Sequence, residues 1–215
     1  MAPCVIRDGR AVIGAEAAYA SPMAQILLFH HARGLTEGVR ALGDQVTAAG
    51  GHIVHTPDLF DGHVFPTAEE GLAYVGQIGS DEFMTRAIRA CAEHKEASVV
   101  AGISLGVMPA WRAAQTAPGF RACIALSAAL PLNAYAPLWQ PHTALQIHLA
   151  AEDPWVKDED LPTARAYAAT AEHPDNPADL FEYATDRHLF MDSSTEDHVP
   201  QLTEVVVQRI VELLA

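Results

Sequence analysis

Short apolar runs alternate with amphipathic segments along most of the chain. The run from Gln25 to Phe29 is apolar on both faces, which predicts a strand buried in the centre of a sheet. Apolar positions at helical spacing then predict a helix over 36–49, and Gly50 and Gly51 end it. The same alternation predicts further strands at 52–56, 97–103, 122–127, 144–150 and 180–184, and further helices at 81–94, 105–116, 161–170 and 201–214.

Repeated strand–helix units predict an α/β fold, with a mostly parallel, twisted sheet and helices on both of its faces. No fixed repeat and no low-complexity linker divides the chain, so we expect one domain over residues 1–215. In such sheets, ligands bind beyond the carboxyl ends of the strands. Residues that carry chemistry should therefore follow the predicted strands.

Two segments depart from this alternation. In residues 1–22, short apolar runs flank Asp8-Gly9, a pair that favours a tight turn, so we expect an N-terminal β-hairpin. Residues 58–80 are predicted to be irregular, and so long a connection often forms a lid or a pocket wall. We expect Phe60, Phe65 and Trp155 to line an apolar substrate pocket. The alternative is that they only pack this loop against the body.

Composition and charge narrow the classes of partner. Half of the 215 residues are apolar, and 27 acidic residues against 13 basic ones give a net charge of −14. The basic residues are scattered, which argues against nucleic acid and anionic membranes as partners. The three cysteines show no C-x-x-C spacing, and no apolar run approaches the ~18–20 residues that span a bilayer. We therefore expect a cytoplasmic enzyme without disulfides, acting on a small molecule.

A nucleophile motif lies where a predicted strand becomes a predicted helix. Residues 102–106 read Gly-Ile-Ser-Leu-Gly and match G-x-S-x-G, the nucleophile elbow of α/β-hydrolases. A serine on so tight a turn is strained, and side chains two residues to either side would collide with neighbouring elements. The alternative is that Ser104 merely caps the following helix.

A serine hydroxyl needs a base to take its proton and a carboxylate to orient that base. Asp153 and His188 follow predicted strands in the order that an α/β-hydrolase requires, and we select them as acid and base. Glu152 is the alternative acid. His173 and His198 also lie late in the chain, but they occupy polar turns beside prolines.

At this point the sequence resembles the dienelactone hydrolase family of α/β-hydrolases. The resemblance implies a hydrolase of small esters or lactones, without a cofactor. It also implies that the backbone N–H groups of Ala32 and Leu105 form an oxyanion hole. The matching segments span nearly the whole chain and read LFHHARGL at 28–35, TPDLF at 56–60, GISLG at 102–106, AEDPWV at 151–156 and RHLF at 187–190.

Three positions depart from the pattern of the family. Ser104 stands where its best-known members carry a cysteine, and His31 stands where they carry an acidic residue. Val107 replaces a further glycine after the elbow. Serine chemistry should widen the substrates to ordinary esters, which makes the dienelactone itself a less suitable substrate.

The histidines of the first third do not predict a metal site, because they show neither H-x-H nor H-E-x-x-H spacing. His31 and Arg33 remain candidates for contact with substrate. We therefore expect a serine esterase or lactonase. The alternatives are a non-catalytic protein that binds a small molecule, and an acyltransferase or thioesterase that uses the same residues. The sequence does not indicate an oligomeric state.

Overall fold

A six-stranded parallel sheet forms the centre of the molecule, in a computed structural model that describes residues 5–7, 10–12, 23–170 and 178–215. Its strand order is β4-β3-β5-β6-β7-β8, and all neighbouring strands are parallel. The predicted α/β fold is confirmed. The strands are β3 (Gln25–Phe29), β4 (Ile53–His55), β5 (Val99–Ile103), β6 (Ala122–Leu126), β7 (Ala144–Ala150) and β8 (Ala178–Tyr183).

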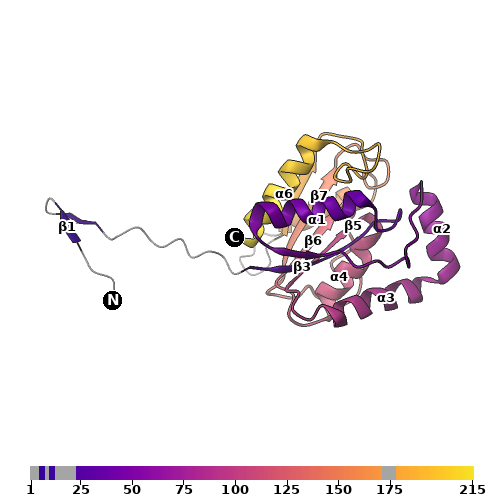
Figure 1. The fold of residues 1–215 in the computed structure, drawn as a ribbon, viewed down its shortest axis with the longest axis horizontal. Coiled ribbons are helices and arrows are strands. Elements are labelled where there is room, and N and C mark those ends of the chain that lie inside the picture. The colour runs from indigo at the N-terminus through magenta and orange to yellow at the C-terminus, as the bar shows by residue number, and fades with distance from the viewer. Residues whose placement is uncertain (1–4, 8–9, 13–22, 171–177) are drawn as a thin grey trace.

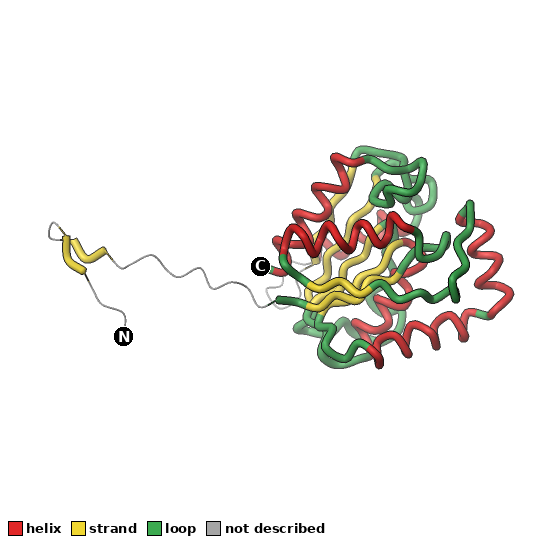
Figure 2. The backbone as a smooth tube through the Cα atoms, viewed as in Figure 1, coloured by secondary structure: helices red, strands yellow, loops and turns green. Residues whose placement is uncertain are grey.

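Helices cover both faces of this sheet (Figures 1 and 2). α1 and α6 lie on one face, and α3, α4 and α5 pack on the other. The short turn η1 (Ser104–Gly106) joins β5 to α4. The helices are α1 (Glu37–Gly50), α2 (Ala68–Ile78), α3 (Ser80–Glu93), α4 (Val107–Thr116), α5 (Asp160–Thr170) and α6 (Pro200–Leu214).

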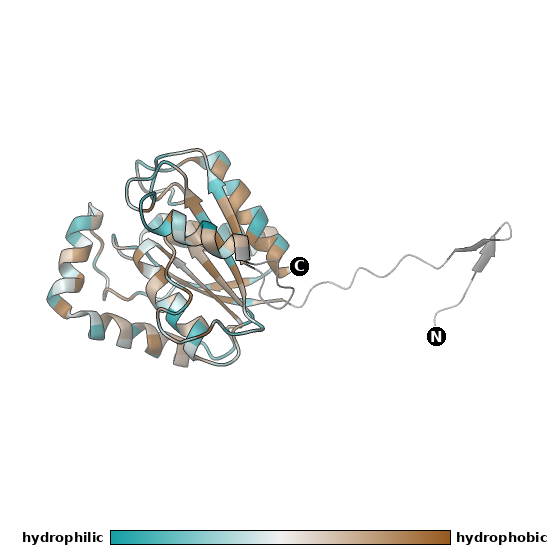
Figure 3. Ribbon diagram, turned by 180° about the vertical axis from the view of Figure 1, so that it is seen from behind, coloured by the Kyte–Doolittle hydropathy of each residue, from teal (hydrophilic) through white to brown (hydrophobic). Residues whose placement is uncertain are grey.

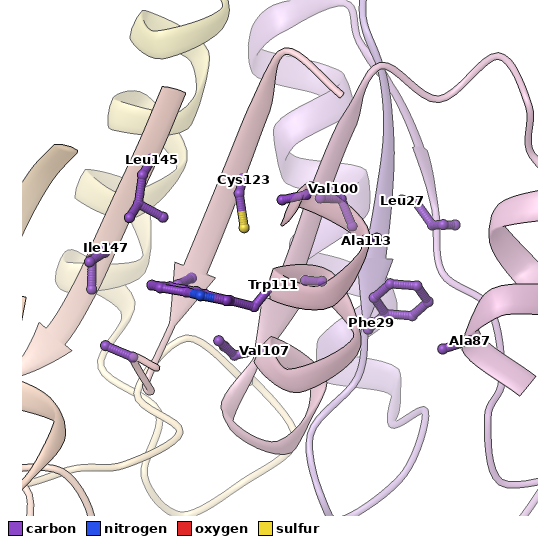
Figure 4. Close-up of a cluster of buried hydrophobic side chains, with 14 of the residues drawn as sticks. Leu27, Phe29, Ala87, Val100, Val107, Trp111, Ala113, Cys123, Leu145 and Ile147 are labelled. Carbon is purple, nitrogen blue, oxygen red and sulfur yellow. The ribbon is translucent and has the colours of Figure 1, made fainter. Parts of the chain in front are cut away.

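Alternate residues of the strands supply two separate cores. Leu27 and Phe29 of β3 face the side of α3 and α4, whereas Ile26 and Leu28 face the side of α1 and α6. The apolar character of the strands is visible in Figure 3. Figure 4 shows Trp111 of α4 lying over the strands that carry Cys123, Leu145 and Ile147. Since both faces are covered, the strands carry continuous apolar runs rather than an alternating pattern.

Capping residues at both ends of α1 explain why its boundaries could be predicted from the sequence. The Thr36 hydroxyl caps the helix by accepting a hydrogen bond of 3.2 Å from the N–H of Val39. At the other end Gly51 adopts a left-handed conformation with φ 69°, and its N–H bonds to the carbonyl of Thr47. The cap and the glycine fix both boundaries.

The prediction that residues 58–80 are irregular was wrong for 68–78, where α2 lies. Thr67 caps α2 by accepting a hydrogen bond from the N–H of Glu70, so a T-x-x-E capping signal was present. Gly71 and Gly76 obscured it, since glycine is a poor helix former.

The N-terminal hairpin is described only in part. β1 (Val5–Arg7) and β2 (Arg10–Val12) pair in antiparallel fashion, with Val5 opposite Val12. The predicted turn at Asp8-Gly9 lies outside the described residues. Within the parts of the chain that the structure describes, no helix is long and apolar enough to cross a membrane.

Candidate active site

Ser104 sits on a strained turn between β5 and α4. Its φ angle is 50°, in the left-handed region that residues other than glycine rarely adopt. A Cβ atom at Gly102 would lie 2.1 Å from the carbonyl oxygen of Gly106, and one at Gly106 would lie 2.5 Å from the carbonyl oxygen of Phe29. Both glycines are therefore required on steric grounds, as expected for a nucleophile elbow.

The structure brings Ser104, His188 and Asp153 into one chain of hydrogen bonds. The Nδ1 of His188 donates to the Oδ2 of Asp153 at 2.6 Å, and its Nε2 lies 2.7 Å from the Oγ of Ser104. A carboxylate only accepts, so Nδ1 carries the proton and Nε2 is free to accept the proton of the serine hydroxyl. Glu152, the alternative acid, is exposed, and His173 lies outside the described residues.

Neighbouring groups hold the acid and the base in place. Asp153 is fully buried, and its Oδ1 accepts a hydrogen bond of 2.9 Å from the N–H of Trp155. The Trp155 ring stacks on the imidazole of His188 at 5.5 Å between centroids. From the end of β6, the hydroxyl of Ser127 donates a hydrogen bond of 2.6 Å to the carbonyl of His188. Asp153 and Trp155 therefore position the imidazole, while Ser127 holds the backbone of His188.

A cavity of about 220 Å³ opens beside Ser104 and His188. Ala32 and Leu105 line it, so the two residues expected to supply the oxyanion hole flank the nucleophile. α2 packs closely behind Ala32, because a Cβ atom at Gly71 would lie 1.6 Å from the carbonyl oxygen of Ala32. Ala68 and Leu72 of α2 also line the cavity. Residues 58–80 thus contribute a wall to it, through a helix.

Of the five residues expected to contact substrate, only Trp155 lines this cavity. Phe60 is fully buried and belongs to the core, in edge contact with Phe65 and Tyr74. The Arg33 side chain points to Glu196, with 3.3 Å between Nη1 and Oε2. For the two phenylalanines, the alternative interpretation, that they pack the loop against the body, is the one that the structure supports.

His31 is a buried structural residue. Its Nε2 donates a hydrogen bond of 2.6 Å to the Oδ2 of Asp192, and the N–H of Arg33 donates to its Nδ1. Burial opposes ionisation of Asp192, but hydrogen bonds from His31, Ser194 and Thr36 hold its pKa well below the usual range. This network ties the loop after β3 to the loop that carries His188.

Sequence reasoning missed two polar residues that line the cavity, Ser127 and Asp160. Ser127 directly follows β6, so the rule that chemistry follows strands would have found it. Asp160 carries no sequence signal beyond that of an acidic residue at the start of a predicted helix, and it is the first residue of α5. Burial is the main cause that raises its pKa above the ordinary value of an aspartate.

The histidines of the first third serve as hydrogen-bonding groups. His30 donates from Nδ1 to the carbonyl of His31 and accepts from the N–H of Leu59 at Nε2. His55 pairs with Gln25 across neighbouring strands. Among the residues that the structure describes, no group of three or more His, Cys, Asp or Glu side chains is arranged to hold a metal ion.

Comparisons with known proteins rest on structure rather than sequence. No family model matches the chain, and no curated protein matches its sequence. A dienelactone hydrolase-like promiscuous phosphotriesterase from metagenomic libraries aligns with a TM-score of 0.67 at 19% identity, over 90% of this chain and 86% of that chain. A dienelactone hydrolase from Anabaena variabilis aligns with a TM-score of 0.54 at 16% identity, over 88% and 84% of the two chains.

A third structure, the esterase domain of a Rhodothermus marinus protein, aligns with a TM-score of 0.53 at 14% identity, over 91% of this chain and 89% of that chain. At these identities the similarity establishes a shared fold. The neighbours also agree with the family that the sequence motifs resemble.

Proposed function

We propose that this chain, which has the α/β-hydrolase fold and dienelactone hydrolase-like neighbours, is a serine hydrolase that cleaves a small carboxylic ester or lactone. The observation that carries the proposal is the continuous hydrogen-bonded chain from Ser104 through His188 to Asp153. A binding protein has no need of a strained serine that is backed by a base and a buried acid.

In the proposed acylation, the Oγ of Ser104 attacks the carbonyl carbon while the Nε2 of His188 takes the hydroxyl proton. Asp153 keeps the imidazole in the required tautomer and stabilises the imidazolium that forms. The tetrahedral intermediate then collapses. The bond to the leaving oxygen breaks, and His188 gives its proton to the departing alkoxide. The acyl group stays on Ser104 as an ester.

Deacylation repeats these steps with water as the nucleophile. His188 takes a proton from a water molecule that attacks the acyl carbon, and it returns the proton to the Oγ of Ser104 as the acid leaves. For both intermediates, the N–H groups of Ala32 and Leu105 are proposed to bind the oxyanion. Loss of one such donor typically costs about 3 kcal/mol in the barrier.

The test combines turnover with covalent labelling. We expect Ser104→Ala to abolish hydrolysis of p-nitrophenyl butyrate and labelling by a fluorophosphonate probe, with thermal unfolding unchanged. Ser98→Ala is the matched control, because Ser98 lies just before the amino end of the same strand. Full turnover by Ser104→Ala would overturn the proposal. A folded wild type that neither reacts with the probe nor hydrolyses the ester would favour the non-catalytic alternative.

The choice between esters, lactones and thioesters requires a substrate panel, because the same three residues serve all of these reactions. We further propose a reducing, cytoplasmic setting. Cys91 and Cys123 are free, and burial raises the pKa of Cys91 to about 11 and that of Cys123 further. Such thiols have little thiolate character.

A further inference from the structure

Asp160 places a carboxylate in a cavity wall that is otherwise largely apolar. Around Ser104, the wall is formed by small and apolar side chains, among them Leu72, Met108 and Val156. Of the described residues that line the cavity, Asp160 is the one with a carboxylate, and none is a lysine or an arginine. Apart from His188, the proposed base, no basic side chain among the described residues lines the cavity, so a substrate seated at Ser104 lies beside a negative group that no lysine or arginine of the wall offsets.

Local structure fixes the position of this carboxylate. Asp160 begins α5, where the N–H groups of the first turn favour a negative charge. Its Oδ2 accepts a hydrogen bond of 2.9 Å from the N–H of Ala129, in the loop after β6. The carboxylate is thus tied to two elements that border the cavity, and it is only partly exposed to water. It cannot swing freely away from a bound substrate.

A fixed, half-buried charge acts on a ligand more strongly than a surface charge, since less water screens it. A second carboxylate brought into the same cavity would lose hydration and meet a like charge. A quaternary ammonium group would instead gain an opposite charge, and the ring of Trp155, which also lines the cavity, offers a face to a cation.

We propose that Asp160 determines substrate specificity by charge: the site accepts neutral and cationic esters and rejects esters that carry a carboxylate near the scissile bond. This inference rests on the proposed esterase function and names its substrate class. It also separates this chain from any hydrolase whose substrate carries a free carboxylate.

The net charge of −14 would also repel anionic substrates over a longer range, so the test must separate local from global charge. Glu159→Gln provides the matched control. It removes the same charge one position away, but Glu159 is exposed and does not line the cavity. Asp160→Asn keeps the shape of the side chain and an oxygen that can accept the hydrogen bond from Ala129.

The experiment measures kcat/KM for three p-nitrophenyl esters that share a four-carbon acyl chain: the butyrate, the anionic hemisuccinate and the cationic 4-trimethylammoniobutyrate. For the wild type we expect the hemisuccinate to be at least about tenfold poorer than the cationic ester. In Asp160→Asn the ratio of kcat/KM for the cationic ester to kcat/KM for the hemisuccinate should fall by about tenfold, which corresponds to about 1.4 kcal/mol. In Glu159→Gln the ratio should stay within twofold of the wild type.

Labelling of Ser104 by a neutral fluorophosphonate shows whether the site is intact in each variant. A labelled Asp160→Asn variant with the wild-type ratio would overturn the charge inference and leave the esterase function standing. If that variant does not fold, the wild type still tests the inference in one direction, because equal or faster cleavage of the hemisuccinate overturns it. A wild type that is neither labelled nor active on any of the three esters would overturn both proposals.

Discussion

The Nε2 of His31 donates a hydrogen bond of 2.6 Å to the Oδ2 of Asp192, although 161 positions separate the two residues. Both side chains are buried, and the hydroxyl of Thr36 also donates to the same oxygen, at 2.5 Å. His31 immediately precedes Ala32, and Asp192 lies on the loop that carries His188. The pair therefore joins the loop of the proposed oxyanion donor to the loop of the proposed base.

Removal of Asp192 should destabilise the fold and slow the reaction. Asp192→Ala leaves the buried donors of His31 and Thr36 without their acceptor, and each buried donor left unsatisfied typically costs about 1–3 kcal/mol. We expect the free energy of unfolding, measured by urea denaturation, to fall by about 3 kcal/mol. We also expect a lower kcat, because the loop with Ala32 loses its anchor.

Asp186→Ala is the control for Asp192→Ala. It removes the same charge from the preceding part of the loop, but the Asp186 side chain is 73% exposed. Its effect should stay below about 1 kcal/mol, as is usual for an exposed ion pair. Equal losses of stability in the two variants would show that the pair of His31 and Asp192 has no special structural role.

Gly71→Ala should impair catalysis through the backbone of Ala32. The added Cβ atom would stand 1.6 Å from the carbonyl oxygen of Ala32, so either α2 or the loop after β3 must move. A shift of about 1 Å in a group near the reacting atoms can cost about a hundredfold in rate. We expect at least a tenfold loss in kcat for p-nitrophenyl butyrate.

The same helix supplies the control for Gly71→Ala. A Cβ atom at Gly76 would meet no atom within 4 Å, so Gly76→Ala tests the change of helix propensity alone. It should stabilise the protein by up to about 1 kcal/mol and leave kcat unchanged. Wild-type kcat in Gly71→Ala would show that the position of Ala32 does not limit the rate.

Hydrophobic periodicity predicted most of the fold because the sheet is buried on both sides. β3 and β7 have the predicted boundaries, and α1 begins within one residue of the prediction. α2 was missed because two glycines weaken its helical pattern, although its capping signal is present. The hydrophobic pattern was therefore clear in the strands and helices that the fold buries, and weak in α2, an exposed helix at the edge of the molecule.

The candidate site could be predicted as far as its residues follow strands. Ser104, Asp153 and His188 do so, and the structure brings them together. Whether a side chain beside them faces the cavity depends on packing that no local pattern encodes. His31 turns inward to Asp192, and Phe60 enters the core.

Ser127→Ala should weaken the base by loosening the backbone of His188. The hydroxyl of Ser127 holds the carbonyl of His188 at 2.6 Å, and a hydrogen bond of this kind contributes about 1 kcal/mol. We expect fluorophosphonate to label Ser104 several-fold more slowly in this variant. Ser98→Ala, the same chemical change before the amino end of β5, should label at the wild-type rate. Equal rates in both variants would remove Ser127 from the supporting network.

The stability of the protein should fall as the solution becomes mildly acidic, in part because of His148. Burial, followed by the nearby Arg209 guanidinium, lowers the pKa of His148 to about 3. Its Nε2 donates to the side-chain oxygen of Gln146, and its Nδ1 accepts from the Tyr183 hydroxyl. A neutral imidazole satisfies both bonds, so protonation would remove the acceptor and bring a positive charge into the core.

The pH window follows from the two protonation equilibria. Between about pH 6.5 and 3 the unfolded chain binds a proton at His148 that the folded chain does not, so stability decreases as the pH falls through this range. At pH 5 the loss from this group is about 2 kcal/mol. Urea denaturation of the wild type and of His148→Gln, each at pH 7 and pH 5, measures this loss of stability, because the other titrating groups are common to both proteins. The free energy of unfolding of the variant relative to that of the wild type should be about 2 kcal/mol higher at pH 5 than at pH 7. A constant difference would show that His148 takes up its proton equally in the folded and unfolded states.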